Sequence, residues 1–332
     1  MIKDDHPIIQ VRDLVKVYGS DTRALDGITF SVAPGEVFGF LGPNGAGKTT
    51  TIRILATLLL ATEGSARVAG FDVAGDPHEV RKRLGVAMQT PTLDAFSTGR
   101  ETLELAGRLH RVPGAEVRRR ADELLELMGL GSVARKLTGT YSGGMKRRLD
   151  LASALMHRPE VAILDEPTEG LDPQSRTALW EELERISAAG TTMLLTTHYM
   201  EEADRLASRL AIIDNGQIVV EGAPAELKRG VGADAVLLQF ESPDGDGQLA
   251  EVRRLLDGIV ASDEVTRHPA GVALAVPNAG SAIPELLRRL EGNGLCIAGL
   301  QMSQPSLDDV FMKYTGRRIR EEAADQPIIL GW

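Results

Sequence analysis

The chain has 332 residues, with 47 acidic and 37 basic side chains and a formal net charge of −10. Its length allows one large domain and a smaller one. The acidic balance argues against a nucleic-acid surface as the main function, so no nucleic-acid partner is expected. Cys296 is the only cysteine, which excludes an intrachain disulfide and fits a reducing compartment.

The most apolar stretch is about eight residues long, starting at Ile54, and a bilayer span needs roughly 20. The first residues, MIKDDHPIIQ, lack the basic and then apolar pattern of a secretory signal. We therefore expect a soluble chain that reaches a membrane only through a partner.

Short β-rich runs at residues 8–37, separated by Gly, Asp and Pro, predict an antiparallel section of hairpins. The apolar run Val37–Leu41 then predicts a buried strand, and KTTTIRILATLLL predicts a helix. Between them GPNGAGKTT fits the pattern G-x-x-x-x-G-K-[ST], in the strand and helix context that a phosphate-binding loop requires. This loop comprises Gly42, Pro43, Asn44, Gly45, Ala46, Gly47, Lys48, Thr49 and Thr50.

The loop has the residue types that nucleotide phosphates and Mg²⁺ require. Its glycines allow successive N–H groups to turn toward the phosphates, and Lys48 supplies a charge near the β- and γ-phosphates. The hydroxyl of Thr49 is a ligand for Mg²⁺. Taken alone, so loose a pattern also occurs in unrelated loops.

The middle of the chain alternates between helical and strand patterns. Residues 98–130 are mainly helical, with apolar side chains at helical spacing. Core strands follow at 161–167, 191–198 and 209–222, with helices between them. This order predicts an α/β fold with a mostly parallel sheet.

Two carboxylates end the apolar run VAIL, namely Asp165 and Glu166. A buried strand presents both at its carboxyl end, where ligands bind in open α/β sheets. One carboxylate then holds Mg²⁺ through water while the next polarises the attacking water. A pair of strand-end acids that cap a neighbouring helix is the alternative.

YSGGMKRRLDLASAL, at 141–155, opens with two glycines and continues as helix-forming sequence. Ser142 is a candidate cap for this helix, whose first N–H groups then form an anion site. The segment has no acidic metal ligand, so it is not a complete nucleotide site.

The boundary of the large domain falls within 221–234, and the rest has a βαβαβ-like order typical of a small α+β domain, ferredoxin-like in type. We predict these divisions: a nucleotide-binding domain at 1–222 with a helical section at about 91–139, a linker at 223–234, an accessory domain at 235–318 and a tail at 319–332.

Residues 8–222 resemble the ATP-binding subunit of an ATP-binding-cassette (ABC) transporter, since five motifs occur in that family's order and spacing. The resemblance implies a P-loop NTPase core with an antiparallel β subdomain and a helical subdomain, and ATP and Mg²⁺ as cofactors. Tyr18 lies where the family stacks an aromatic ring on adenine. Gln89 matches the glutamine that touches Mg²⁺ and the attacking water.

Within the same resemblance, Asp165 matches the metal-side carboxylate and Glu166 the catalytic carboxylate. In a closed interface the neighbouring acid is expected to disfavour the charge of Glu166, which helps it accept a proton. His198 matches the histidine that contacts the γ-phosphate, and Asp172 matches the loop that crosses to a second subunit.

YSGGM matches the family signature, which closes over the γ-phosphate held by the opposite subunit. Ser142, Gly143 and Gly144 are the matching residues, and the match implies a homodimer that forms on ATP. Met145 stands where the family has glutamine and cannot complete a capping box, at a cost of about 0.5–1 kcal/mol. Glu169 departs from the family's usual serine and leaves the contacts of the crossing loop open.

The form YSGGMKRRLDLA is similar to bacterial drug-exporter ATPases of the daunorubicin-resistance type, and QPSLDDVFMKYTGR resembles the end of their C-terminal extension. That last segment is equally natural as a packing helix with Leu307, Val310 and Phe311 on one face. The branch implies an integral membrane permease as partner and a peripheral position on the cytoplasmic face of the bacterial plasma membrane.

Other functions remain open at this stage. An ABC importer differs from an exporter in no catalytic residue, and a non-transport ABC ATPase has the same core. A binding module that uses ATP only as a conformational switch is the alternative from another class, which intact Glu166 and His198 argue against. The transported substrate is set by the membrane subunit and stays undetermined.

Overall fold

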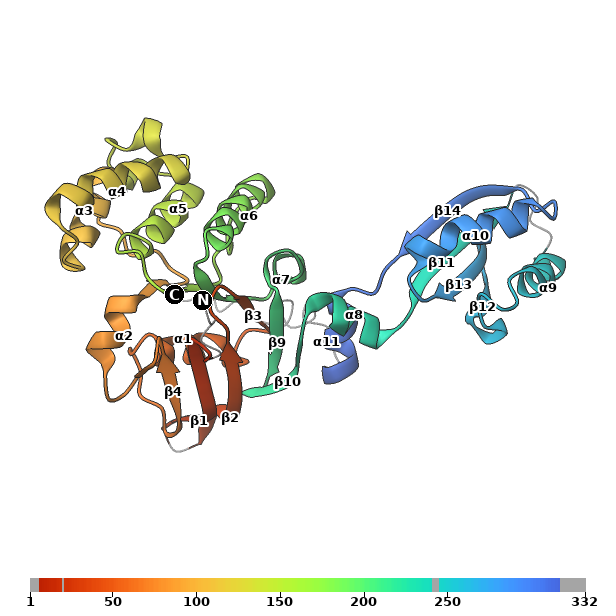
Figure 1. Cartoon of the computed structure of the whole chain (residues 1–332), viewed down its shortest axis with the longest axis horizontal. Helices are drawn as coiled ribbons and strands as arrows, with labels where there is room; N and C mark the ends of the chain where they lie inside the picture. Colours follow the sequence, from red (N-terminus) through yellow and green to blue (C-terminus); the bar gives the residue numbers. More distant parts are fainter. Residues whose placement is uncertain (1–5, 20, 241–244, 317–332) are drawn as a thin grey trace, which may run out of the picture. The chain divides into compact units, whose positions relative to one another are not determined.

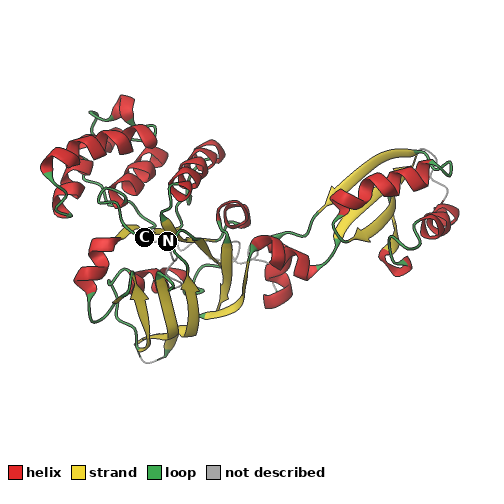
Figure 2. Ribbon diagram, in the orientation of Figure 1, coloured by secondary structure: helices red, strands yellow, loops and turns green. Residues whose placement is uncertain are grey.

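The computed structural model describes residues 6–19, 21–240 and 245–316, so the tail predicted at 319–332 lies outside the described residues. The chain divides between Pro224 and Ala225 into two compact units (Figure 1). Helices cover the main sheet of the first unit, while the second has its own small sheet (Figure 2).

A six-stranded sheet forms the centre of the first unit, in the order β10-β9-β3-β8-β7-β6. All neighbours pair in parallel except β10, which pairs antiparallel with β9. The mostly parallel α/β sheet predicted from the sequence is thus confirmed. The strands are β3 (Val37–Leu41), β6 (Leu84–Ala87), β7 (Val161–Asp165), β8 (Thr192–Thr197), β9 (Arg209–Asp214) and β10 (Gln217–Gly222).

The central strands are buried on both faces, which explains their nearly continuous apolar sequences. Every residue of β3, β7 and β8 is buried. Alternate residues of β7 belong to different cores: Ile163 packs in one cluster and Leu164 in the other. The sheet therefore divides the first unit into two hydrophobic layers.

An antiparallel sheet in the order β2-β1-β4-β5 packs beside this core, which confirms the hairpin section predicted near the N-terminus. Its strands are β1 (Ile9–Tyr18), β2 (Thr22–Val32), β4 (Glu63–Val68) and β5 (Phe71–Asp72). Phe30 of β2 contacts Phe38 and Phe40 of β3, with ring centroids 5.5 and 4.8 Å apart. These aromatic contacts join the two sheets.

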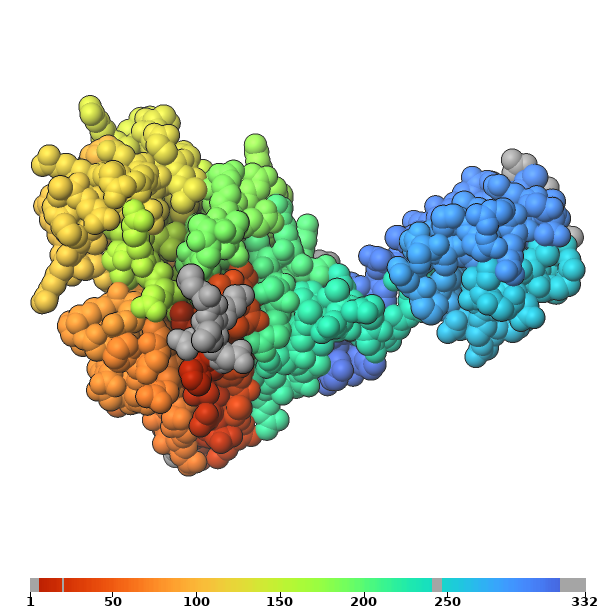
Figure 3. All heavy atoms as spheres, viewed as in Figure 1, coloured from red at the N-terminus to blue at the C-terminus, as the bar shows by residue number. Residues whose placement is uncertain are grey.

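The helices of the first unit are α1 (Lys48–Leu55), α2 (Pro77–Arg83), α3 (Gly99–Leu109), α4 (Gly114–Leu127), α5 (Gly143–Ala154), α6 (Pro173–Ala188) and α7 (Met200–Leu206). The helix predicted after the phosphate loop ends earlier than its sequence indicates, because Thr57 adopts a positive φ of 61°. Leu58 and Leu60 are then exposed. Helices α3 and α4, coloured yellow, project as a lobe (Figure 3).

The second unit has a four-stranded antiparallel sheet in the order β12-β13-β11-β14, with the βαββαβ sequence of a ferredoxin-like fold. It contains β11 (Asp234–Phe240), α9 (Gly245–Leu255), β12 (Val265–His268), β13 (Gly271–Val276), α10 (Ala279–Glu291) and β14 (Ile297–Ser303). Strand β12 was not predicted, because Val265 is its only buried residue and three exposed polar residues follow.

Two further helices belong to this second unit. The segment predicted as a linker contains α8 (Pro224–Val231), and the last described helix is α11 (Leu307–Thr315). Ser306 and Asp309 form a capping box at the start of α11. Leu307, Val310 and Phe311 are at most 2% exposed, so the predicted packing face is confirmed.

Candidate nucleotide site

The predicted phosphate loop connects the carboxyl end of β3 to the start of α1. Gly45 and Gly47 have φ values of 81° and 110°, which side chains rarely tolerate. At Gly42 a Cβ atom would lie 2.2 Å from the carbonyl oxygen of Ile213. The loop conformation therefore requires these glycines, and their bare backbone leaves room for phosphate oxygens to approach.

Lys48 begins α1 and is 4% exposed. Its Nζ donates hydrogen bonds to the carbonyl oxygens of Gly42 and Pro43 at 2.7 and 3.0 Å. It also lies 3.2 Å from Oε1 of Glu166. The ammonium group thus joins the phosphate loop to the catalytic carboxylate predicted after β7.

Asp165 is fully buried at the end of β7. Its Oδ1 accepts hydrogen bonds from the hydroxyls of Thr49, at 3.3 Å, and Thr196, at 2.6 Å. Burial raises the pKa of Asp165, which these hydroxyls partly offset. Its Oδ2 is buried without a hydrogen-bond partner in the described part of the chain.

The oxygen donors here fit a magnesium ion, which prefers carboxylate and hydroxyl oxygens. Oδ2 of Asp165 is an orphaned acceptor, and the Thr49 hydroxyl is directed at the same carboxylate. A metal ion or its bound water would satisfy this buried oxygen. Asp165 and Thr49 are therefore the residues that would hold a magnesium ion here.

Glu166 follows β7 with a positive φ of 45° and is 5% exposed. Its Oε2 lies 3.1 Å from Nδ1 of His198, and its Oε1 pairs with Lys48. Burial acts to raise the pKa of Glu166, but His198 and Lys48 outweigh it and the pKa is lowered. Within one chain the charge is therefore favoured, because two neighbours stabilise the carboxylate. The expectation that this charge is disfavoured applied to a closed interface.

Gln89 follows β6, and together with Glu166 it lines a cavity of about 240 Å³ at the phosphate loop. The Gln89 amide donates to Oε2 of Glu169 at 2.6 Å. Glu169, which departs from the family pattern, thus contacts Gln89, the glutamine predicted to touch Mg²⁺. The other lining residues are Pro43, Asn44, Gly45, Gly47, Lys48, Thr49 and Thr50.

Nine of the predicted site residues are not among those that line this cavity, namely Tyr18, Gly42, Ala46, Ser142, Gly143, Gly144, Asp165, Asp172 and His198. Tyr18 is 38% exposed at the end of β1, with Nζ of Lys16 5.3 Å from its ring centroid. Asp172 caps α6 and accepts a hydrogen bond from the backbone N–H of Ser175 at 3.0 Å. Ser142 caps α5, accepting from the N–H of Met145 at 3.3 Å.

The start of α5 is open to solvent, since Ser142 and Gly143 are exposed while Gly144 is buried. A cavity of about 720 Å³ beside it is lined by Arg135 and Lys136 together with Met145. Positive side chains and free helix N–H groups make this surface suited to an anion.

Sequence reasoning missed two residues at the site, Thr196 and Arg147. Thr196 of β8 is the register partner of Asp165 of β7. Its place beside Asp165 follows from the pairing of the two strands, which the sequence does not show. Arg147 stands in the run KRR, which is usual on a solvated helix face, yet it is 4% exposed and donates to four backbone carbonyls at this site.

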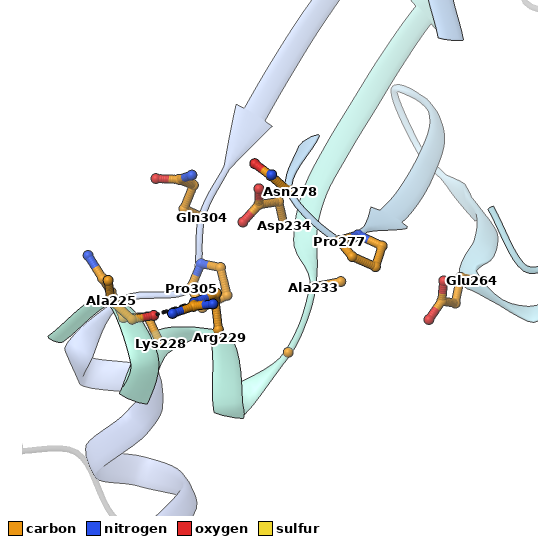
Figure 4. Close-up of a pocket in the computed structure, with 11 residues that line it drawn as sticks. Ala225, Lys228, Arg229, Ala233, Asp234, Glu264, Pro277, Asn278, Gln304 and Pro305 are labelled. Atoms are coloured by element: carbon orange, nitrogen blue, oxygen red, sulfur yellow. Dashed lines mark hydrogen bonds between the residues drawn. The ribbon is translucent and has the colours of Figure 1, made fainter. Parts of the chain in front are cut away.

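A larger cavity, about 780 Å³, lies elsewhere, within the second unit (Figure 4). Two of its charged groups serve local structure: Asp234 accepts from the N–H of Ala279, and Arg229 donates to the carbonyl of Ala225. It contains no paired nucleophile and base. The smaller cavity of the phosphate loop is therefore the candidate site for the chemistry.

A phosphate loop, strand-end carboxylates and an exposed SGG helix start on one α/β core define a class of ATPase. The chain belongs to the family of ABC transporter ATP-binding proteins: the ABC transporter family model matches residues 25–169. The model of the C-terminal domain of DrrA1-3-like ATP-binding proteins matches residues 222–315.

Individual relatives agree with this family. The chain is 43% identical to the daunorubicin resistance ATP-binding protein DrrA2 of Streptomyces coeruleorubidus, over 96% of this chain and 98% of the relative. A solved ATP-binding subunit of an ABC transporter has a TM-score of 0.62 at 31% identity, covering 67% of this chain and 92% of that one. A dimeric post-hydrolysis state of the ATP-binding cassette MJ0796, bound to ADP and Pi, has a TM-score of 0.59 at 26% identity, with coverages of 65% and 98%.

No helix within the described residues is long and apolar enough to cross a membrane.

Proposed function

We propose that this chain is the ATP-hydrolysing subunit of a drug exporter, which dimerises on ATP and drives efflux through a separate membrane permease. One observation carries the proposal: the site is divided over two surfaces. Lys48, Thr49, Gln89 and Glu166 share one cavity, whereas the anion-ready start of α5 is exposed outside it. A second copy, placed head to tail, completes each site.

The residues of one chain divide the work as follows. The phosphate loop and Lys48 hold the phosphates, and Asp165 with Thr49 holds Mg²⁺, which would neutralise charge that develops on the phosphates. Glu166 accepts the proton of the attacking water, and His198 orients that carboxylate. Ser142 of the opposite copy closes over the γ-phosphate, with Gly143 and Gly144.

Export of a drug or antibiotic is supported by the near full-length similarity to a daunorubicin resistance ATP-binding protein and by the C-terminal family model. The permease places the chain at the cytoplasmic face of the plasma membrane. An importer uses the same ATPase core, so the membrane subunit that co-purifies with the chain from native membranes distinguishes the two.

Replacing Glu166 by Gln tests the dimer. The amide keeps the shape of the carboxylate but accepts no proton, so ATP stays bound and the closed dimer accumulates. Sedimentation velocity with saturating ATP and Mg²⁺ should then show a dimer for E166Q and a monomer without nucleotide. A monomer under saturating ATP contradicts the head-to-tail scheme.

Lys48→Ala provides the matched control. It removes the phosphate contact, so E166Q/K48A should remain monomeric with ATP, and K48A alone should lose turnover. Retained ATPase activity in K48A would overturn the assignment of the phosphate loop.

A further inference from the structure

Arg147, in the second turn of α5, connects that helix to the carboxyl end of the central sheet. Its Nε donates to the carbonyl oxygen of Pro167 at 2.8 Å, and Nη2 donates to that of Asp165 at 2.7 Å. Nη1 donates to the carbonyl oxygen of Met88. One side chain thus joins α5 to the loop before Gln89 and to the backbone on both sides of Glu166.

These carbonyl groups lie at or just beyond the ends of β6 and β7, adjacent parallel strands whose pairing ends at Ala87 and Leu164. The planar guanidinium presents five N–H donors in a fixed fork, which suits several acceptors at set distances. A lysine ammonium, as a point donor, lacks this geometry. The contact therefore fixes the relative positions of three backbone segments.

The position of this charge is costly, since Arg147 is 4% exposed. Its nearest counter-charge is Oδ2 of Asp150, 3.5 Å away on the same helix. Apolar side chains of similar volume usually pack a helix as well as a buried ion pair does. The hydrogen bonds of this buried guanidinium go to backbone carbonyls at the site, so it is instead suited to holding a defined geometry.

The N-terminal end of α5 is the surface that we propose faces the phosphate. Ser142 caps the helix five residues before Arg147, which corresponds to roughly 7.5 Å along the helix axis. A segment this short moves as a rigid body. A displacement of Ser142 is therefore transmitted through Arg147 to the backbone next to Gln89 and Glu166.

We infer that Arg147 is a positioning residue that couples the two nucleotide sites of the dimer. When Ser142 engages the γ-phosphate held by the opposite copy, Arg147 draws the Gln89 and Glu166 backbone of its own chain into the hydrolytic geometry. This inference rests on the proposed head-to-tail dimer. The coupling makes hydrolysis at one site depend on nucleotide at the other.

Arg147→Gln tests this role against Arg148→Gln, a matched control on the same helix. Arg148 donates to the carbonyl oxygen of Met128, at 3.0 Å, and within its own helix to that of Gly144, at 3.5 Å. In the described part of the chain it has no hydrogen bond to the backbone beside Gln89 or Glu166 such as Arg147 makes. In R147Q the nucleotide Kd of the isolated chain should stay within about threefold, while kcat falls about tenfold or more, since charged hydrogen bonds are lost. The Hill coefficient for ATP should fall to one.

R148Q should keep the wild-type kcat and Hill coefficient. Equal Hill coefficients in R147Q and wild type would overturn the coupling. A parallel loss of nucleotide affinity and kcat would also overturn it, because such a loss indicates a general structural defect. Loss of cooperativity in R148Q as well would likewise contradict the specific role of Arg147.

A mixed dimer gives a readout that does not depend on the folding of R147Q. An isotope-labelled Lys48→Ala chain binds no nucleotide, but its Ser142 still meets the ATP analogue held by an unlabelled partner. Hydrogen exchange resolved by mass should show protection at residues 143–150 and also at 86–91 of the labelled chain. The second segment responds only if the start of α5 is coupled to it.

Protection confined to residues 143–150 overturns the inference and leaves the dimer intact. Protection at neither segment shows instead that Ser142 does not face the partner's nucleotide, and then the proposed function fails together with the inference. The two failures are therefore distinguishable.

Discussion

The carboxylate of Glu166 is held in a strained and charged environment that favours a defined orientation. Its backbone has a positive φ, and its two oxygens contact Lys48 and His198. Such strain persists only where surrounding contacts enforce it, and it is common at active sites. Lys48 occupies one oxygen in the single chain, so phosphates that draw Lys48 away would raise the proton affinity of Glu166.

Asp150 gives a prediction for the pH dependence of stability. Burial raises its pKa to about 6, although Arg147 acts in the opposite direction. The native state then binds more protons than the unfolded state between about pH 4 and 6, so this group's contribution to stability falls as pH rises through that window.

Asp150→Asn should remove this dependence. The difference in free energy of unfolding, D150N minus wild type, should increase between pH 4 and 7. The increase should be at most about 3 kcal/mol, since each pKa unit corresponds to about 1.36 kcal/mol. Urea denaturation at several pH values measures the difference. Stability curves that run parallel for the two proteins would contradict the prediction.

At this scale the sequence predicted groups that belong to a motif and missed those defined by three-dimensional contact. Lys48, Thr49, Gln89 and Glu166 line one cavity as their motifs indicate. Arg147 was not predicted as a site residue. Its hydrogen-bond acceptors are backbone carbonyls, which every residue has, so no sequence pattern identifies them.

Helix α5 illustrates what a local pattern determines. Ser142 caps the helix as predicted, and Met145 at the third position provides a backbone N–H but no capping-box side chain. Instead, the Met145 side chain packs against the main cluster of the first unit. Local rules thus predict where the helix starts, whereas tertiary packing determines what Met145 contributes.

Ser142 allows capping and phosphate binding to be separated. Alanine at an N-cap costs about 1 kcal/mol of stability and glycine only a few tenths. Both replacements remove the hydroxyl. If that hydroxyl meets the partner's γ-phosphate, S142A and S142G should lose turnover equally, about tenfold or more, while only S142A lowers the Tm.

Thr98→Ala serves as the control for this comparison, because Thr98 caps α3 through the N–H of Glu101 and lies outside the phosphate cavity. It should lower the Tm but leave turnover at the wild-type level. Full activity in S142G would show that the hydroxyl has no role beyond the cap.

On the scale of the whole molecule, the sequence predicts the fold type of each unit better than its details. Alternating strands and helices predict the parallel sheet, and the ferredoxin-like arrangement follows from the order of elements. Strand β12 and helix α8 were missed, since a polar edge strand and a short helix in a presumed linker have weak apolar patterns. The proposed division of the site between two copies is a property that no single sequence displays directly.

The two units have separate hydrophobic cores, with Val236 and Leu286 in the cluster of the second and all nucleotide-site residues in the first. We therefore predict two calorimetric transitions. ADP with Mg²⁺ at about 100 times its Kd adds about 2.7 kcal/mol to the unit that binds it. For a unit of this size the shift in Tm is about 5–10 °C, and the second transition should not move.

A chain truncated after Pro224 should retain the nucleotide-sensitive transition alone. A single transition that shifts as a whole would show that the units unfold together, and the C-terminal unit would then report directly on nucleotide binding.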